Sequence, residues 1–248
     1  MASAFGADWQ TRHVATRVVE METTPSTQLE ARRMIELGDA DGVLVIAHRQ
    51  TAGRGRLGRE WVSPDGGNLY LSFILRPRRP VSEWHQFTMM AALALAEAME
   101  ATAAVVVQLK WPNDLMIDRA KVAGILAEVA DAYVIVGVGV NVNADLPAEL
   151  AEAVSLKQAA HRPVNTRELL RRFVIQFDGY YDSSLRGATF EQAWAARLYT
   201  LGKAVRARVG EREIVGIAET VDATGALWIR TAEGTRISCP AGEVTLRW

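Results

Sequence analysis

The sequence predicts an α+β fold: a mixed, mostly antiparallel sheet flanked by helices, followed by a small β domain. Between residues 104 and 142 four strand-like segments follow one another with only tight turns between them. Such strands pair antiparallel, because parallel partners need long crossovers. Two longer segments repeat apolar residues at helical spacing. From Leu201 the pattern changes to short strands separated by turns, so we expect domains at 1–200 and 201–248.

The N-terminal half alternates strand-like and helical segments. Pro25 ends the first strand, because proline disfavours helical backbone at the residue before it. Ser26 or Thr27 can cap the next helix, and Thr27 with Glu30 has the spacing of a capping box. We expect Leu29 on the buried face of this helix. The expected elements are an irregular arm over 1–16, strands over 18–22, 42–47 and 68–75, and helices over 27–37 and 82–100.

The second half contains the four close strands, two more helices and the C-terminal strands. Asn165 or Thr166 can cap a helix whose apolar residues repeat at three- and four-residue steps. Gly137 and Gly139 lie on one face of a predicted strand, and we interpret them as a β-bulge. The expected strands cover 104–109, 115–117, 122–129, 133–142, 204–209, 213–220, 226–231, 236–238 and 243–246, and the helices cover about 165–181 and 189–199.

The composition bounds the class of protein. The 248 residues are 49% hydrophobic and 23% charged, with a formal net charge of −1, which argues against broad electrostatic binding to DNA. The longest apolar runs are too short to span a bilayer, and no leader pattern is visible. The single cysteine, Cys239, excludes an internal disulfide and fits a reducing compartment. We therefore expect a soluble, cytoplasmic protein.

The most informative segment is residues 53–61, GRGRLGREW. Its glycines allow positive φ angles and a close approach of the backbone to a ligand. Its three arginines carry forked guanidinium groups that suit phosphate or carboxylate oxygens. The spacing matches neither the phosphate loop nor the Rossmann fingerprint. The segment by itself is compatible with a specific small-anion site, with a solvated turn in an arginine-rich protein, or with an Arg-Gly segment that binds RNA non-specifically.

Two lysines stand out in a chain that has 4 lysines and 24 arginines. Lys110 opens the segment KWPND, which offers an ammonium, an amide and a carboxylate within five residues at the junction of two predicted strands. Lys121 begins the following strand, and the connecting turn can bring it to the same end of the sheet. Both positions indicate a need for a compact ammonium rather than a planar guanidinium.

Four motifs in this order resemble those of biotin protein ligases: GRGRLGREW at 53–61, KWPND at 110–114, KVAGILAE at 121–128 and GVGVNVN at 137–143. The resemblance extends from about residue 18 to the C-terminus. It implies a catalytic domain with a mixed sheet flanked by helices and a C-terminal SH3-like β-barrel. It also implies that ATP converts biotin to biotinyl-5′-AMP, and that the biotin passes to a lysine of a biotin carboxyl carrier protein.

The resemblance implies roles for individual residues. It assigns catalysis to Lys121, beside the reacting carboxyl and phosphate oxygens, and to Arg54. The residues that it places around biotin are Ser26, Thr27, Gln50, Arg54, Gly55, Arg56, Lys121 and Gly124. Those that it places around ATP or the adenylate are Arg54, Arg56, Arg59, Trp61, Lys110, Asn113, Asp114, Lys121 and Asn141. Asp114 is also the candidate ligand of the Mg²⁺ that is expected to accompany ATP.

These residue types fit the chemistry. A carboxylate that attacks the α-phosphate of ATP brings two anions together, so cations that neutralise the developing charge lower the barrier. The reactive mixed anhydride must then be kept from water, which an ordering loop can do. Glycines supply the mobility of such a loop and arginines supply its contacts.

Other interpretations stay open at this point. A lipoate-protein ligase of the same superfamily, or a non-catalytic nucleotide- or RNA-binding module, would also use basic loops. Fewer than twenty residues precede the first predicted strand, so we expect no DNA-binding domain and no repressor activity. Leu57 stands where the family often has another basic residue. The resemblance allows a monomer or a ligand-promoted homodimer.

Overall fold

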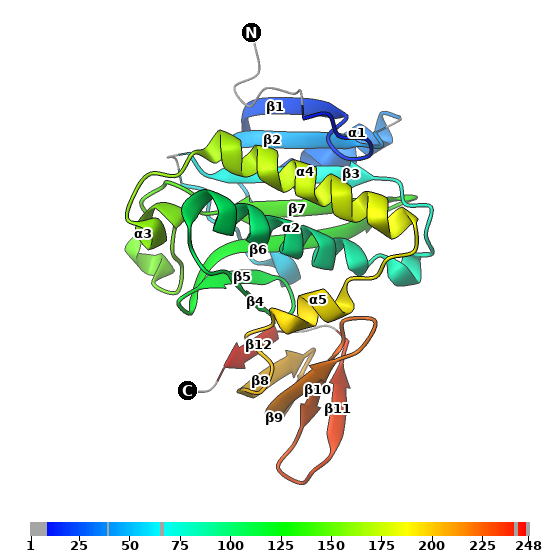
Figure 1. The fold of residues 1–248 in the computed structure, drawn as a ribbon, viewed down its shortest axis with the longest axis vertical. Coiled ribbons are helices and arrows are strands. Elements are labelled where there is room, and N and C mark those ends of the chain that lie inside the picture. Colours follow the sequence, from blue (N-terminus) through cyan, green and yellow to red (C-terminus); the bar gives the residue numbers. More distant parts are fainter. Residues whose placement is uncertain (1–8, 39, 65–66, 241–242, 247–248) are drawn as a thin grey trace.

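The computed structural model of the chain describes residues 9–38, 40–64, 67–240 and 243–246. Within these residues the strands form two sheets (Figure 1). The larger is seven-stranded, in the order β1-β2-β3-β7-β6-β5-β4, and the smaller is five-stranded, in the order β11-β10-β9-β8-β12. Only the β1–β2 pair is parallel among the described strands, so the predicted α+β fold with a mixed, mostly antiparallel sheet is confirmed.

The helices and strands have the following bounds. The large sheet contains β1 (Arg17–Thr24), β2 (Val43–Gln50), β3 (Leu69–Leu75), β4 (Gln108–Lys110), β5 (Asp114–Ile117), β6 (Ala120–Ala130) and β7 (Tyr133–Val140). The α-helices are α1 (Thr27–Glu36), α2 (Gln86–Ala103), α3 (Leu156–Ala160), α4 (Thr166–Leu185) and α5 (Glu191–Ala196). Short 3₁₀ turns are η1 (Arg56–Gly58), η2 (Val81–Glu83) and η3 (Ala148–Leu150). The small sheet contains β8 (Ala204–Val209), β9 (Arg212–Val221), β10 (Leu227–Arg230), β11 (Arg236–Cys239) and β12 (Glu243–Leu246).

The large sheet carries helices on both faces, and alternate residues of its strands serve the two sides. Helices α2 and α4 lie together on one face (Figure 1), where Phe73 packs edge-on against Phe173 and Phe177. Helix α1 covers part of the other face, where its Ala31 and Ile35 join a separate buried cluster with Ile74. The face under α2 and α4 therefore holds the main core, whereas α1 covers only part of the opposite face.

Several predicted boundaries were wrong for identifiable reasons. The long helix begins with the 3₁₀ turn η2 and continues to Ala103, so the strand expected over 104–109 shrinks to β4. Ala104 then takes a left-handed φ of 56° and ends the helix. At α1 the expected capping box does not form, because Ser26 is the N-cap and its side chain makes no capping hydrogen bond. Leu29 is 42% exposed, so its predicted burial was also wrong.

Other predicted features agree with the structure. Asn165 caps α4, since its Oδ1 accepts a hydrogen bond from the backbone N–H of Glu168. The continuous apolar run over 42–47 is a strand that is buried on both faces. The expected arm over 1–16 has no helix in its described part, and residues 1–8 lie outside the described residues.

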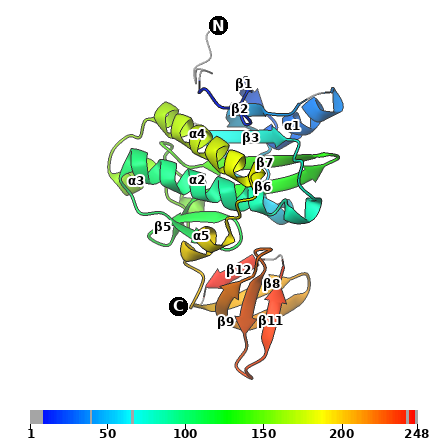
Figure 2. The same cartoon turned by 45° about the vertical axis from the view of Figure 1, so that its right-hand side comes forward.

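The small sheet packs at one end of the large sheet, beside α5 (Figure 2). Trp111, only 2% exposed, links the large sheet to the small one, because its indole Nε1 donates to the carbonyl of Gly225, between β9 and β10, at 2.8 Å. Its backbone N–H donates to Thr200 Oγ1, just before β8, at 2.9 Å. A tryptophan of the KWPND segment is thus held by a turn of the small sheet. Across the described residues, we find no helix with the length and apolar character needed to cross a membrane.

Candidate functional site

A cavity of about 170 Å³ lies on the α1 face of the large sheet, over strands β6 and β7. It gathers segments that are far apart in the sequence. The predicted site residues that line it are Ser26, Thr27, Gln50, Arg54, Gly55, Arg56, Arg59, Trp61, Lys110, Asn113, Asp114, Lys121 and Gly124. Asn141 does not line it: this residue is 4% exposed, and its backbone N–H donates to the carbonyl of Val122.

Residues 53–61, which we call the arginine loop, fold into a small hairpin at the cavity mouth. The N–H of Trp61 donates to the carbonyl of Gly53 at 2.9 Å, and the N–H of Gly55 donates to the carbonyl of Arg59 at 2.8 Å. At the tip, Leu57 and Gly58 both have positive φ, 55° and 75°, as in the tight turns that suit hairpins. The loop is therefore a defined, closed hairpin.

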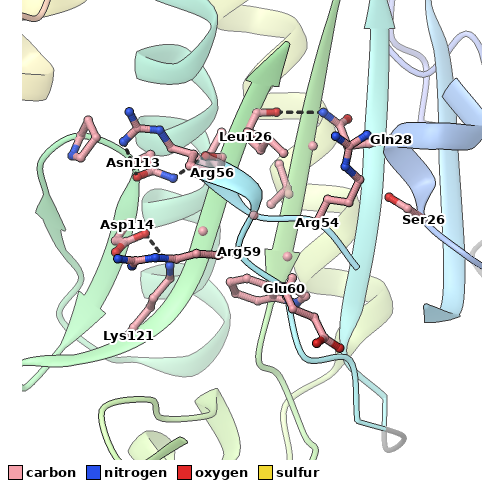
Figure 3. A pocket seen from close by; sticks show the side chains of 18 of the residues that line it. Ser26, Gln28, Arg54, Arg56, Arg59, Glu60, Asn113, Asp114, Lys121 and Leu126 are labelled. Carbon is pink, nitrogen blue, oxygen red and sulfur yellow. Dashed lines mark hydrogen bonds and ion pairs between the residues drawn. The ribbon is translucent and has the colours of Figure 1, made fainter. Parts of the chain in front are cut away.

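The arginine loop reaches across the cavity to the turn between β4 and β5. Arg56 Nη1 donates to Asn113 Oδ1 at 3.3 Å, and Asn113 Nδ2 donates in turn to the carbonyl of Ile125 at 2.7 Å (Figure 3). This bridge links the GRGRLGREW and KWPND motifs over β6. Opening the loop has to break it.

The cavity is strongly positive. Five cationic side chains line it, against the two carboxylates Asp114 and Glu60. Lys121 Nζ lies 2.6 Å from Asp114 Oδ1 (Figure 3) and 5.3 Å from the centre of the Trp61 ring. An excess of cations in a partly enclosed site favours a multiply charged anion. The cations are Arg54, Arg56, Arg59, Lys110 and Lys121.

Strand glycines form a seat for the indole of Trp61. Gly124 and Gly139 are direct cross-strand partners on β6 and β7. A Cβ added to Gly139 would lie 2.4 Å from Trp61 Cε2, and one added to Gly124 would lie 3.0 Å from Trp61 Cζ3. The pairing register is regular through Gly137 and Gly139, so the predicted bulge was wrong and the glycines provide space instead.

A chain of polar side chains closes the end of the cavity near α1. Gln50 Oε1 accepts from the backbone N–H of Thr27 at 2.9 Å, and Thr27 Oγ1 lies 2.9 Å from Ser72 Oγ. Ser72 Oγ also lies 2.9 Å from Gln28 Oε1. Ser26 Oγ is buried with no hydrogen-bond partner among the described residues. A polar ligand group at this end can supply the missing partner.

Sequence reasoning missed Gln28 and Ser72. Gln28 is 3% exposed and fills the space above Gly137, where an added Cβ would lie 2.8 Å from its Cδ. Its Nε2 donates to Glu128 Oε2 at 3.1 Å. It also donates to the carbonyl of Leu126 at 3.4 Å, and this contact is drawn in Figure 3. The sequence held one signal for Gln28: it directly follows Ser26 and Thr27, which were already predicted to contact the ligand.

The donor set offers little for a resident metal. Across the part of the chain that the structure describes, no group of three His, Cys, Asp or Glu side chains could hold a metal ion. Asp114 and Glu60 are the carboxylates of the cavity. One or two carboxylates together with substrate phosphates are the usual surroundings of Mg²⁺. The cavity itself therefore supplies at most these two carboxylates to a metal ion.

Family models match most of the chain in two parts. Residues 20–143 match the biotin/lipoate A/B protein ligase family, and residues 200–247 match the biotin protein ligase C terminal domain. The two matches cover the cavity and the small sheet respectively. They fit the resemblance that the four motifs indicated.

Individual relatives agree. The chain is 36% identical over 240 residues to a biotin–[acetyl-CoA-carboxylase] ligase of Paracoccus denitrificans, covering 89% of this chain and 97% of that protein. It is 33% identical over 238 residues to the bifunctional ligase/repressor BirA of Bacillus spizizenii, covering 92% and 73%. The biotin protein ligase of Aquifex aeolicus in complex with biotin and ATP superposes with a TM-score of 0.82 at 30% identity, covering 94% and 99%. The chain belongs to the biotin/lipoate A/B protein ligase family, among its biotin protein ligases.

Proposed function

We propose that this protein activates biotin with ATP to biotinyl-5′-AMP and transfers the biotin to a specific lysine of a biotin carboxyl carrier protein. The observation that carries the proposal is the cavity itself: a closed arginine loop, Lys121 and a polar chain at Gln50 converge on one glycine-floored site. Solved relatives that match the fold bind biotin and ATP. A lipoate ligase or a non-catalytic RNA module is not favoured, because the relatives are biotin ligases.

In the first step, an oxygen of the biotin carboxylate forms a bond to the α-phosphorus of ATP. The bond from that phosphorus to the bridging oxygen breaks, and pyrophosphate leaves. We assign the stabilisation of this step to Lys121, because it lies among the cationic side chains that line the cavity. There its ammonium can hold both anions and oppose the negative charge that develops. We assign Arg54, Arg56, Arg59 and Lys110 to the phosphates, and Asn113 and Trp61 to the nucleotide.

At the α1 end, Ser26, Thr27 and Gln50 are assigned to the ureido group of biotin. The unpaired Ser26 Oγ and the Thr27–Gln50 hydrogen bonds support this, because a ureido group carries one carbonyl acceptor and two N–H donors. Gly55 and Gly124 line the cavity beside these residues and are assigned to the biotin contacts as well. Asn141 lies outside the cavity lining, and its assignment to the adenine depends on the family resemblance alone.

Mg²⁺ is proposed to enter with ATP. Asp114 is the carboxylate that would help to hold it, since it lies in the cavity beside Lys121. When bound, the ion would neutralise part of the negative charge of the phosphates. The residues of the chain still have to orient biotin and exclude water.

In the second step, the amine of the acceptor lysine attacks the acyl carbon of biotinyl-5′-AMP, AMP leaves, and the amine loses a proton. The acceptor has to approach from outside the closed loop. The pairing of β6 with β5 ends at Gly124, although β6 continues to Ala130, so residues 126–130 have no strand partner on that side within the described residues. An open strand edge next to the cavity supports docking of the carrier protein there by strand addition.

Three further assignments belong to this proposal. The catalytic domain spans residues 1–200 and the C-terminal SH3-like domain spans 201–248. The same β6 edge is available to a second copy, so light scattering with and without biotin and ATP distinguishes a monomer from a ligand-promoted dimer. A cytoplasmic location is supported by the single, buried, free cysteine, Cys239.

The deciding experiment is isotope exchange between pyrophosphate and ATP with purified protein, Mg²⁺ and either biotin, lipoate or no acid. Biotin-dependent exchange is the expected result. If lipoate supports exchange and biotin does not, the substrate is lipoate. If neither acid supports exchange, the protein does not carry out the proposed activation step.

Lys121→Ala provides a direct test of the proposed catalytic cation. We expect adenylate formation to fall by about a hundredfold or more, because a group that stabilises charge in the transition state is lost. Lys157→Ala, which removes an exposed lysine paired with Asp145, is the matched control. Single-turnover rates near those of the unchanged protein would exclude Lys121 from the mechanism.

A further inference from the structure

A second, larger concavity of about 560 Å³ lies away from the catalytic cavity and shares none of its lining residues. It sits where β2 begins and β3 ends, whereas the catalytic cavity uses the opposite ends of these strands. Seven residues of extended strand separate the two ends, or roughly 20 Å. The lining residues are Arg12, His13, Thr16, Asp41, Gly42, Arg76, Arg78, Arg79, Tyr181 and Leu185.

The lining is dominated by guanidinium groups that come from separate segments. Four arginines line the concavity together with one carboxylate, that of Asp41. Asp41 accepts a hydrogen bond from the backbone N–H of Arg76 at 2.8 Å. Arg79 is committed elsewhere, since it pairs with Glu83 at 2.7 Å and donates to the carbonyl of Ser184. Neither Arg12 nor Arg78 has an ion-pair partner among the described residues.

The backbone around these arginines is fixed rather than incidental. The carboxylate of Asp178 on α4 accepts hydrogen bonds from the backbone N–H groups of Arg12, His13 and Val14, at 3.0, 2.7 and 2.9 Å. Asp178 is 8% exposed. The N-terminal segment is thereby held at one wall of the concavity, with Arg12 attached to α4.

Tyr181 adds a phenol hydroxyl group to the lining. Its side chain is 7% exposed, and none of the described residues receives or supplies a hydrogen bond at its hydroxyl. Burial raises the pKa of Tyr181 to about 12, with a further increase from Asp41 that Arg78 and Arg79 oppose. The hydroxyl therefore stays protonated and can donate a hydrogen bond to an anion.

We propose that this concavity, which we call the basic pocket, is a second anion site that binds a small, multiply charged phosphate compound. Guanidinium groups from two sides and a phenol hydroxyl match the several oxygens of a phosphate group. A volume of about 560 Å³ is in the range of small-molecule sites and exceeds what one inorganic ion fills. A pyrophosphate or a phosphorylated metabolite fits this description.

Inorganic pyrophosphate without Mg²⁺ is the probe, and backbone hydrogen exchange read by peptide is the measurement, because it separates the two anion sites. We expect saturable protection of peptides containing Arg12 and residues 76–79, at constant ionic strength. Arg54→Ala with Lys121→Ala removes binding at the catalytic cavity and should leave this protection unchanged.

The Arg12→Ala/Arg78→Ala double variant should need about ten times more pyrophosphate, or more still, for half-maximal protection, because each substitution removes a charge-assisted hydrogen bond. Both side chains are exposed and unpaired, so the melting temperature should not change. Tyr181→Phe keeps the shape and should weaken binding by a smaller factor. Arg167→Ala, an exposed arginine on α4 outside the pocket, is the matched control and should bind normally.

Several results would overturn the proposal. They are an absence of saturable protection, equal effects of Arg167→Ala and the Arg12/Arg78 double variant, or equal protection by sodium chloride. Equal protection by succinate at the same concentration would refute the preference for phosphate.

Discussion

Gly139→Ala tests whether the glycine pair exists to seat Trp61. The φ of Gly139 is not in the left-handed region, so the backbone conformation accepts alanine and the only obstacle is the space for its Cβ. Its Cβ would lie 2.4, 2.7 and 2.8 Å from three indole atoms, whereas ordinary contact begins at 3.4 Å. The indole has to retreat by about 1 Å. At Gly124 the shortest contact is 3.0 Å, so only a few tenths of an ångström are needed.

The size of the expected effect follows from where the strain can go. Trp61 is half-buried and belongs to a loop, so the indole moves more easily than the sheet. We expect stability to change by at most about 1 kcal/mol, or about 2–4 °C in melting temperature. A displacement of about 1 Å near reacting groups can cost about a hundredfold in rate. We therefore expect a loss of this size in Gly139→Ala and less than about tenfold in Gly124→Ala.

The assay is biotin-dependent exchange of pyrophosphate with ATP, combined with thermal unfolding. A double-mutant cycle isolates the cause: in a Trp61→Ala background, Gly139→Ala should cost no more than about a factor of two, because the clash is gone. Normal exchange in Gly139→Ala would refute the seat. So would a larger loss in Gly124→Ala, or an undiminished loss in the Trp61→Ala background.

Two further predictions concern stability. Gly179→Ala, at an exposed position inside α4 with nothing within 4 Å of an added Cβ, should stabilise the protein by about 0.5–1 kcal/mol without changing exchange activity; a lower melting temperature would contradict this. Burial acts to raise the pKa of Asp222, but hydrogen bonds from Thr224 and Trp228 outweigh it and leave the pKa lowered. Its stabilisation is therefore complete above the unfolded pKa of about 4 and is lost as pH falls through the lower folded value. Asp222→Asn should reduce the melting temperature at neutral pH by about 2–4 °C, and a deficit that persists unchanged at pH 2–3 would disprove the linkage.

Local signals predicted most elements because they depend on near neighbours. Asn165 caps α4 as its spacing indicated, and the four close strands pair antiparallel. The failures occurred where distant contacts decide. Ser26 makes no side-chain cap, and the N–H of Thr27 at the first helical position is taken by Gln50 from β2, a partner that local spacing does not indicate. Leu29 is exposed, because the buried face of α1 is turned toward the sheet through Gln28 and Ala31.

By itself the sequence determined the family and the composition of the site, because four motifs of fixed spacing carry that information along the chain. Only the tertiary structure decided how those residues meet. It paired Gly124 with Gly139 under Trp61, joined Arg56 to Asn113, and assembled the basic pocket from arginines more than sixty positions apart. The physical reason is that strand register and helix packing are set by long-range burial, and the spacing of neighbouring residues does not encode which distant side chains share a cavity.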